Sequence, residues 1–261
     1  YIHLINDLSF AQTYYPKSKI INYLNQLAEK AFQKIYRTKR QDTNRILSFW
    51  KTEAPLIVFQ YRRYIAYAFI IFFCFVTIGV ISAANDTTFV RLILGEDYVN
   101  RTLENIQKGD PVAIYKTGSN WGGFLAITFN NLFVGIKSFI YGIFGGLGTG
   151  FVLMQNGIML GAFQYMFQQE GVFWESVRGI WIHGAMEIFA IVIEGAAGLL
   201  LGASILFPKT FTRIESFKIG VKDGVKILIS TFPFTIAAGF LEGFVTRYSN
   251  AMPHFLSVGI I

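Results

Sequence analysis

Long apolar runs alternate with shorter polar segments over most of the chain, and they predict five helices that cross a membrane. Residues 64–84 are 21 residues without a charge, which is the length that spans the hydrocarbon core of a bilayer. Four further runs follow, and the predicted spans are residues 64–84, 121–145, 150–168, 179–207 and 227–246. A hydrophobic content of 53% with only 15% charge agrees with this pattern, because soluble domains carry more charge. We therefore predict an all-α, polytopic membrane helix bundle.

Glycine is placed where these helices are expected to turn and to touch. The glycine-rich stretch 145–150 separates the second and third runs and predicts a tight turn between them. Pairs of glycines four residues apart allow the backbones of two helices to approach closely. Such pairs are Gly142 with Gly146, Gly157 with Gly161, and Gly198 with Gly202. We expect all six glycines at helix contacts.

Residues 1–63 read as a cytoplasmic, amphipathic helical region in front of the first span. Pro16 interrupts it, since proline disfavours helix in the residue before it. Ser18 can cap the helix that follows, in which Ile21, Leu24 and Ala28 share one face. That face suits packing within the protein's own cytosolic layer, against a partner, or on the lipid surface. Since the chain starts at Tyr1, we also expect some sequence to precede it.

The basic residues predict how the bundle is oriented. Residues 1–63 contain eleven Lys and Arg against four acids, and the basic connection 208–226 contains five, whereas the loop 85–120 has four against five acids. Cytoplasmic segments are richer in Lys and Arg, so the N-terminus is expected inside. The loop 85–120, with a short helix over 97–108, and the tail 247–261 are then outside. The net charge of +7 suits anionic lipid rather than nucleic acid, because it gathers beside the spans.

The run 179–207 contains no Lys, Arg or Asp, but it does contain three ionisable residues. His183, Glu187 and Glu194 are four and seven residues apart, so all three lie on one face of a helix. An ionisable side chain at membrane depth costs at least about 2.5 kcal/mol, so this face must look into protein or water. The predicted intramembrane polar cluster is Asn130, Asn131, Lys137, His183, Glu187, Glu194 and Glu242.

Several functions are compatible with this polar cluster. It can be a structural lock of ion pairs and hydrogen bonds, or a path for protons, ions or a polar solute. His183 and Glu187 are weak candidates for metal ligands, because the second His of an HExxH helix is missing. No Ser or Cys stands in a recognisable nucleophile setting, so we predict no catalytic residue, no cofactor and no enzyme activity.

A set of short motifs runs along most of the chain: 11–16, Asn130 with Asn131, 142–150, Asn156 with Gly157, Gly161, His183 with Gly184, Glu187, 195–202 and 242–244. In these motifs the sequence resembles the stage II sporulation protein M family of bacterial and archaeal membrane proteins. The resemblance implies about five membrane helices in a bacterial or archaeal cytoplasmic membrane. It also implies an anchoring role, since the namesake holds a peptidoglycan-degrading complex whose enzymes are separate proteins. The chain departs from the family pattern at Glu194, where many relatives have a small or apolar residue.

From these observations we expect a membrane scaffold or complex subunit that links cytosolic and envelope partners. It would be a homo-oligomer or part of a larger membrane complex. The alternative is a transporter or channel component that uses the His, Glu and Lys residues as a polar path. An intramembrane hydrolase with metal at His183 and Glu187 is a third possibility.

Overall fold

In the computed structural model the chain is helical, and the all-α prediction is confirmed: no strand occurs among the described residues, which are 2–36, 45–86, 88–116, 118–252 and 259. The chain divides into two compact units, Tyr1–Leu47 and Ser48–Ile261. Each unit is described by itself below. Most of the tail predicted over 247–261 lies outside the described residues.

The first unit contains a helical hairpin. Helix α1 (Ile2–Tyr14) ends just before Pro16, and α2 (Ile20–Tyr36) follows a short turn. The Ser18 hydroxyl accepts a hydrogen bond from the Ile20 N–H at 3.3 Å, so this serine lies at the start of α2. Ala11 and Ala28 are buried, whereas most aromatic side chains of the hairpin are exposed. The hairpin thus presents a largely uncovered apolar surface.

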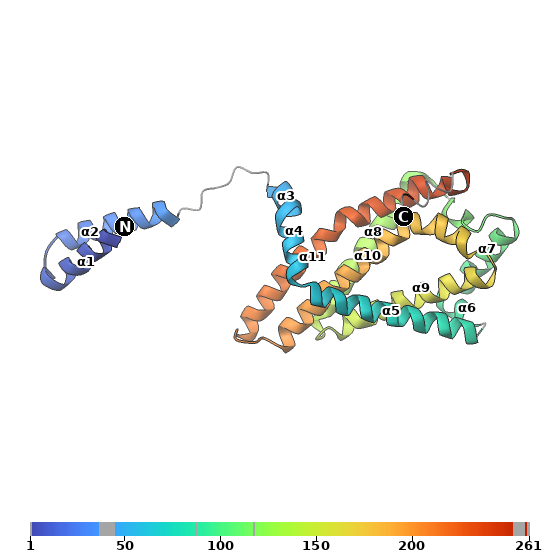
Figure 1. The fold of residues 1–261 in the computed structure, drawn as a ribbon, viewed down its shortest axis with the longest axis horizontal. Coiled ribbons are helices and arrows are strands. Elements are labelled where there is room, and N and C mark those ends of the chain that lie inside the picture. Colours follow the sequence, from blue (N-terminus) through green and yellow to red (C-terminus); the bar gives the residue numbers. More distant parts are fainter. Residues whose placement is uncertain (1, 37–44, 87, 117, 253–258, 260–261) are drawn as a thin grey trace. The chain divides into compact units, whose positions relative to one another are not determined.

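The second unit is a bundle of long helices with short helices at its ends (Figure 1). Its elements are the end of α3 (Arg45–Ser48), η1 (Phe49–Glu53), α4 (Ala54–Gln60), α5 (Arg62–Asn85), α6 (Phe89–Leu94), α7 (Glu96–Gln107), η2 (Ala113–Lys116), α8 (Asn120–Ile140), η3 (Tyr141–Ile143), α9 (Leu147–Gln169), α10 (Phe173–Leu206), α11 (Arg213–Phe240), η4 (Leu241–Val245) and η5 (Thr246–Ala251). The helices α5, α8, α9, α10 and α11 form the body of the bundle.

In the part of the chain that the structure describes, four helices are long and apolar enough to cross a membrane. They cover Arg62–Asn85, Asn120–Ile143, Phe173–Leu206 and Arg213–Ser249. The third predicted span, 150–168, corresponds to α9, whose 23 residues reach about 34 Å at 1.5 Å per residue. Its sequence is less apolar because it contains five Asn and Gln side chains. Four candidate spans are thus found among the described residues, and a span over 150–168 stays a prediction.

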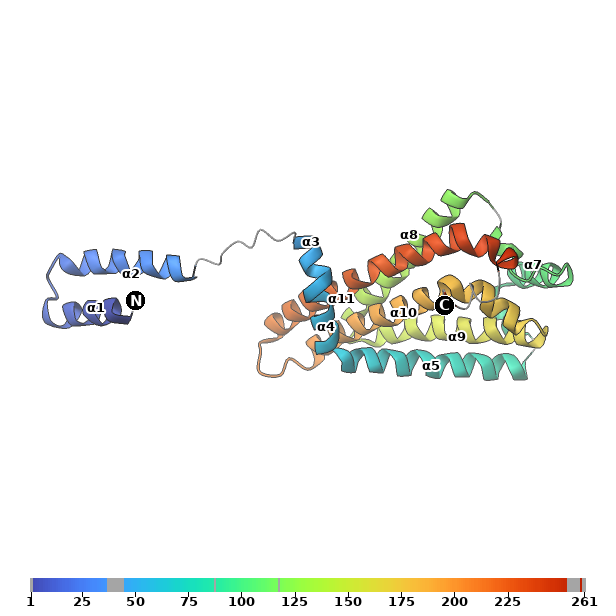
Figure 2. The same ribbon diagram turned by 45° about the horizontal axis from the view of Figure 1, so that its top comes forward.

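Helix α9 lies along α5 over most of its length, as both views show (Figures 1 and 2). The contact is made at small residues of α9. A Cβ atom on Gly157 would lie 2.7 Å from the carbonyl oxygen of Phe72, and one on Gly161 would overlap the carbonyl oxygen of Val76. The two backbones therefore touch directly, in the way that small residues permit in membrane helices.

The turn between α8 and α9 lies against α10 through pairs of glycines. Gly142 faces the backbone of Gly198, and Gly202 faces the backbone of Gly146. Gly145 and Gly146 have φ values of 65° and 85°, which residues with a side chain rarely adopt. The turn therefore requires glycine for its conformation as well as for its close approach to α10.

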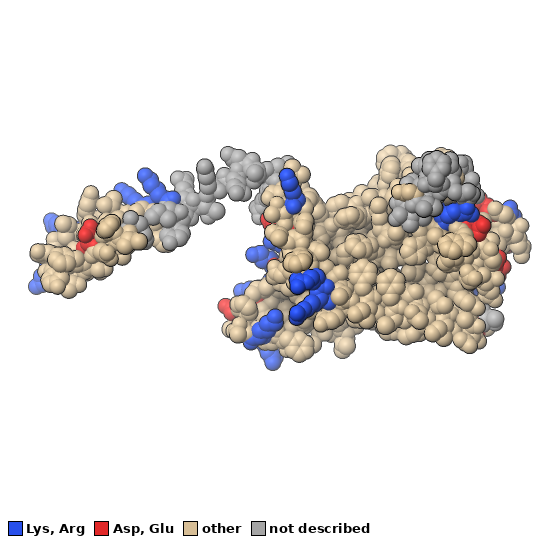
Figure 3. Space-filling model, viewed as in Figure 1, with Lys and Arg blue, Asp and Glu red and all other residues tan. Residues whose placement is uncertain are grey.

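The basic segment predicted as a connection over 208–226 is mostly helical. Helix α11 begins at Arg213, and the Thr212 hydroxyl accepts a hydrogen bond from the Glu215 N–H at 3.3 Å. The cap lets the helix extend beyond its apolar part. Figure 3 shows Lys and Arg atoms of this unit gathered at the end where α4 and the turn between α10 and α11 lie, beside a broad band without charged atoms. Such a band is typical of a surface that faces lipid.

A partly buried contact holds the start of α5 to α11 at this basic end. The Tyr61 hydroxyl donates a hydrogen bond to Asp223 Oδ2 at 2.6 Å, and Lys226 pairs with Glu53 at 2.8 Å. Burial, followed by the hydrogen bond to Asp223, raises the pKa of Tyr61 above its ordinary value. Tyr61 therefore stays a neutral donor at every ordinary pH.

We expect Tyr61→Phe to lower the free energy of unfolding by about 1.5–3 kcal/mol, since a hydrogen bond to a charged acceptor is lost. Because the pKa of Tyr61 is raised in the folded state, this contribution is complete below the ordinary tyrosine value of 10.0 and is lost as the pH rises beyond it. Unfolding in detergent at pH 8 measures the change. Tyr64→Phe is the control, and an equal loss there would contradict a specific role for the bond.

Candidate functional site

A cavity of about 610 Å³ lies between α8, α9 and α10, with walls also from α5, α6, α7 and η4. Its walls are mostly apolar, but polar side chains converge on it from four of these elements. They are Asn130, Asn131, Asn156, Gln164, His183, Glu187 and Glu242. An apolar pocket with a few converging polar groups is the usual form of a small-molecule site.

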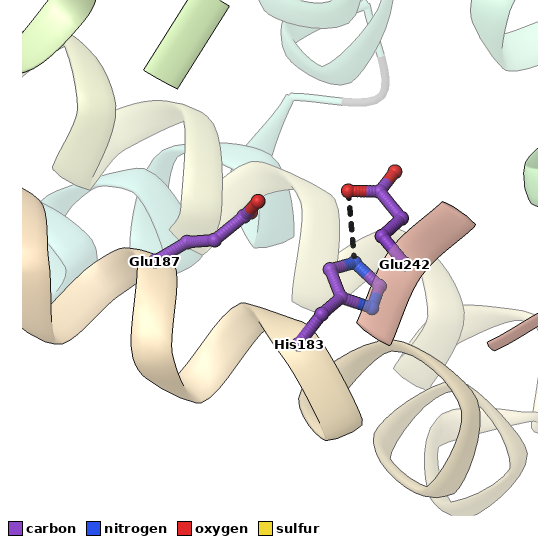
Figure 4. A group of neighbouring side chains, drawn as sticks. All are labelled: His183, Glu187 and Glu242. Atoms are coloured by element: carbon purple, nitrogen blue, oxygen red, sulfur yellow. Dashed lines mark ion pairs between the residues drawn. The ribbon is translucent and has the colours of Figure 1, made fainter. Parts of the chain in front are cut away.

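Three of these side chains form a compact group, the His–Glu–Glu group: His183, Glu187 and Glu242. Figure 4 shows His183 and Glu187 on the same helix, with Glu242 facing them from another segment. His183 Nε2 lies 3.6 Å from Glu242 Oε2, and one ligand atom from each residue lies within 4.8 Å of the other two. His183 and Glu187 share a face because they are four residues apart on α10.

Two further residues orient this group. The Asn131 side-chain amide donates a short hydrogen bond to Glu187 Oε1. His183 Nδ1 pairs with the Thr246 hydroxyl at 2.9 Å, and His183 is 2% exposed. Thr246 was not expected from the sequence, because a threonine at the end of an apolar run carries no signal of such a contact. The Thr246 hydroxyl thus fixes one side of the imidazole, and the Glu242 carboxyl lies near its other side.

The structure places Glu194 apart from the His–Glu–Glu group. It follows Glu187 by seven residues, about 10.5 Å along α10. Glu194 is 1% exposed, and its Oε1 accepts a hydrogen bond from the Thr231 hydroxyl at 2.7 Å. Its Oε2 lies against Gly135 and has no hydrogen-bond partner in the part of the chain that the structure describes. Glu194 is therefore a second, enclosed polar site.

We expect Glu194→Met to raise the free energy of unfolding by about 1–3 kcal/mol, because it removes a buried oxygen without a partner. The Thr231 hydroxyl also donates to the Leu228 carbonyl at 2.7 Å, so it stays satisfied. Thr231→Val, which removes the remaining partner of Glu194, is expected to act in the opposite direction. Unfolding of both variants in detergent checks this pair. A loss of stability in Glu194→Met would contradict it.

The remaining members of the predicted polar cluster take different places. Asn130 and Asn131 line the cavity. Lys137 does not line it, and its Nζ lies 5.5 Å from the centre of the Tyr141 ring. Although Asn130 and Lys137 are seven residues apart on α8, the cavity ends before it reaches Lys137. The cavity thus brings together five of the seven predicted residues and leaves Lys137 and Glu194 outside.

The charge of the cavity limits what it can hold. Among the described lining residues there are two carboxyl groups and one imidazole, but no Lys or Arg. Ser, Thr and Cys are also absent from this lining set, and Tyr98 supplies its one hydroxyl group. The arrangement favours a cation or a neutral polar solute over an anion.

Comparison with known proteins gives a family but no reaction. A family model described as stage II sporulation protein M matches residues 68–247. A domain of unknown function matches residues 1–37. An uncharacterized protein of Methanocaldococcus jannaschii is 30% identical over 125 residues, and the alignment covers 47% of this chain and 55% of that protein. No solved structure matches.

The matched range contains every residue of the His–Glu–Glu group, Asn131, Thr246 and all six glycines of the predicted helix contacts. It also contains all or most of each long helix of the bundle. The match covers more than two thirds of the chain. The chain therefore belongs to the stage II sporulation protein M family, and it is a membrane protein of that family.

Proposed function

We propose that this protein takes a small cationic or neutral polar solute into the cavity between α8, α9 and α10, as a component of a transporter or channel. The observation that carries the proposal is the cavity of about 610 Å³ with Glu187, Glu242 and His183 in its wall. Ionisable residues at membrane depth mark substrate and ion paths when they face a cavity. No enzyme activity is part of this proposal.

The size of the cavity favours a path over a structural lock. In a lock, the polar groups pack against one another and leave no room. A cavity of this size has space for on the order of 20 water molecules. It also lies within the range of roughly 300–1,000 Å³ that is usual for ligand pockets. Carboxyl groups that face such a space keep part of their hydration when no solute is bound.

Reaction of a new cysteine with a water-soluble thiol reagent tests this proposal. The exposed Cys74 is first replaced by alanine. We expect Ala126→Cys, in the cavity wall, to react in lipid vesicles, because water reaches it and thiolate forms there. Phe129→Cys, on the same helix but outside the lining and 68% exposed, is expected to face lipid and to react slowly. Equal, slow reaction at both positions would indicate a dry cavity and contradict the proposal.

A scaffold role is the second candidate, and the first unit favours it. Its hairpin carries exposed aromatic side chains at Phe10, Tyr14 and Tyr23, which suit contact with a partner. The excess of Lys and Arg over residues 1–63 favours a cytoplasmic N-terminus in the cytoplasmic membrane. Native mass spectrometry after mild extraction tests this role. A lone monomer in repeated preparations would contradict both an oligomer and a larger complex.

A further inference from the structure

We infer that His183, Glu187 and Glu242 bind one divalent transition-metal ion, of the Zn²⁺ or Mn²⁺ class, at the wall of the cavity. This inference rests on the proposed function in one respect, since it names the solute class for the same cavity. The three side chains come from α10 and η4, so the site exists only when these elements are packed together.

The spacing of the donor atoms fits an ion better than a direct contact. His183 Nε2 and Glu242 Oε2 are 3.6 Å apart, which is too long for a hydrogen bond. Two donor atoms bound to one ion at about 2.0–2.2 Å lie roughly 3–3.6 Å apart in tetrahedral or octahedral geometry. One donor atom from each of the three residues lies within 4.8 Å of the other two. A small inward movement of the Glu187 side chain would therefore bring all three atoms to the distances of bound ligands.

The residues around the donors favour the form that binds metal. With an ion on Nε2, the ring proton of His183 is on Nδ1, which then donates to the Thr246 hydroxyl at 2.9 Å. The Asn131 amide holds Glu187 Oε1, and this leaves Oε2 of Glu187 for the ion. Partners of this kind fix the orientation of metal ligands in many proteins.

The charges and donor types select the ion. Two carboxylates balance a divalent cation, and the lining residues among those described contain no competing Lys or Arg. An imidazole nitrogen favours Zn²⁺ or Fe²⁺ over Mg²⁺ and Ca²⁺, which prefer oxygen ligands, and the two carboxylates also suit Mn²⁺. Three protein ligands leave positions open for water or for exchange. Nearby amide oxygens at Asn130, Asn156 or Gln164 line the space into which such an ion would move.

Direct binding to the purified chain tests the inference. After treatment with a chelator, Zn²⁺ and Mn²⁺ are titrated by calorimetry, with Mg²⁺ and Ca²⁺ for comparison. We expect one tight ion per chain for at least one transition metal. The affinity should fall at least about 10-fold to 100-fold in His183→Gln and Glu242→Gln. Glu194→Gln, a buried carboxyl on the same helix, and His3→Gln, in the first unit, should leave it unchanged.

A measurement on the unaltered protein guards against variants that fail to fold. X-ray absorption of the Zn²⁺-loaded chain should show one imidazole nitrogen with oxygen atoms at about 2.0–2.2 Å. Absence of tight binding, binding retained in both His183→Gln and Glu242→Gln, or a spectrum without imidazole would overturn the inference. If no metal binds, the reactivity of Ala126→Cys still tests the proposed transport path independently. If the cavity is dry but an ion binds, the transport path is contradicted and the metal site is retained.

Discussion

Glu242→Gln should abolish solute passage while the protein still folds. In vesicles that contain the purified chain, we expect uptake of Mn²⁺ to fall on the order of 100-fold, because one ligand and one of two balancing charges are removed. Glu242 is the member of the His–Glu–Glu group that does not come from α10. Its loss therefore leaves His183 and Glu187 without the residue that faces them across the cavity.

The control for this prediction is Glu104→Gln, on α7, where the carboxyl pairs with Lys108 at the surface. It removes one negative charge without touching the cavity, and uptake should be unchanged. Circular dichroism and elution in detergent establish that both variants fold. Full uptake in folded Glu242→Gln would exclude a path through this group. Loss of uptake in both variants would indicate a general charge effect instead.

Gly161→Ala is expected to lower the free energy of unfolding by at least about 3 kcal/mol, because the added Cβ overlaps the backbone of α5. The added Cβ would overlap the carbonyl oxygen of Val76 and would lie 2.9 Å from the backbone nitrogen of Val80. Neither atom can move without displacing the helix. Overpacking against side chains usually costs about 1–3 kcal/mol, and a backbone neighbour cannot relax by changing rotamer.

Gly150→Ala is the matched control, because it lies on the same helix and a Cβ there meets nothing within 4 Å. It should be neutral or stabilising by up to about 1 kcal/mol, since alanine favours helix more than glycine does. Thermal unfolding in detergent, followed by tryptophan fluorescence, compares the two variants. Equal stability of Gly161→Ala and Gly150→Ala would mean that α5 and α9 are less closely packed than the structure has them.

Much of the fold follows from hydropathy because a bilayer requires long apolar helices. The spans over 64–84, 179–207 and the later part of α11 correspond to observed helices. Polarity separates α9 from the four clear candidates, because its Asn and Gln side chains lower its apolar content, and two of them, Asn156 and Gln164, line the cavity. The helical start of α11 was also missed, since a basic sequence reads as a connection although Thr212 caps it.

The candidate site was predicted in part. Helical periodicity places His183 and Glu187 on one face of α10, and spacing suffices for that because it is a local property. The same rule places Glu194 on this face of α10. The face runs along the whole helix, however, and the cavity borders only the part that contains His183 and Glu187. Lys137 is separated from Asn130 for the same reason. Glu242 was expected in the cluster, yet its position opposite His183 depends on how α11 and η4 cross α10.

The sequence by itself determined the class of protein, the long helices and the presence of ionisable side chains within them, because the apolar solvent acts on each segment independently. Which of these side chains meet was decided by the tertiary structure. Close packing at Gly142, Gly161 and Gly202 sets the positions of the helices, and these positions bring Glu242 to His183 and enclose Glu194 with Thr231. The contacts join residues far apart in the chain, and no local pattern encodes the crossing of two helices.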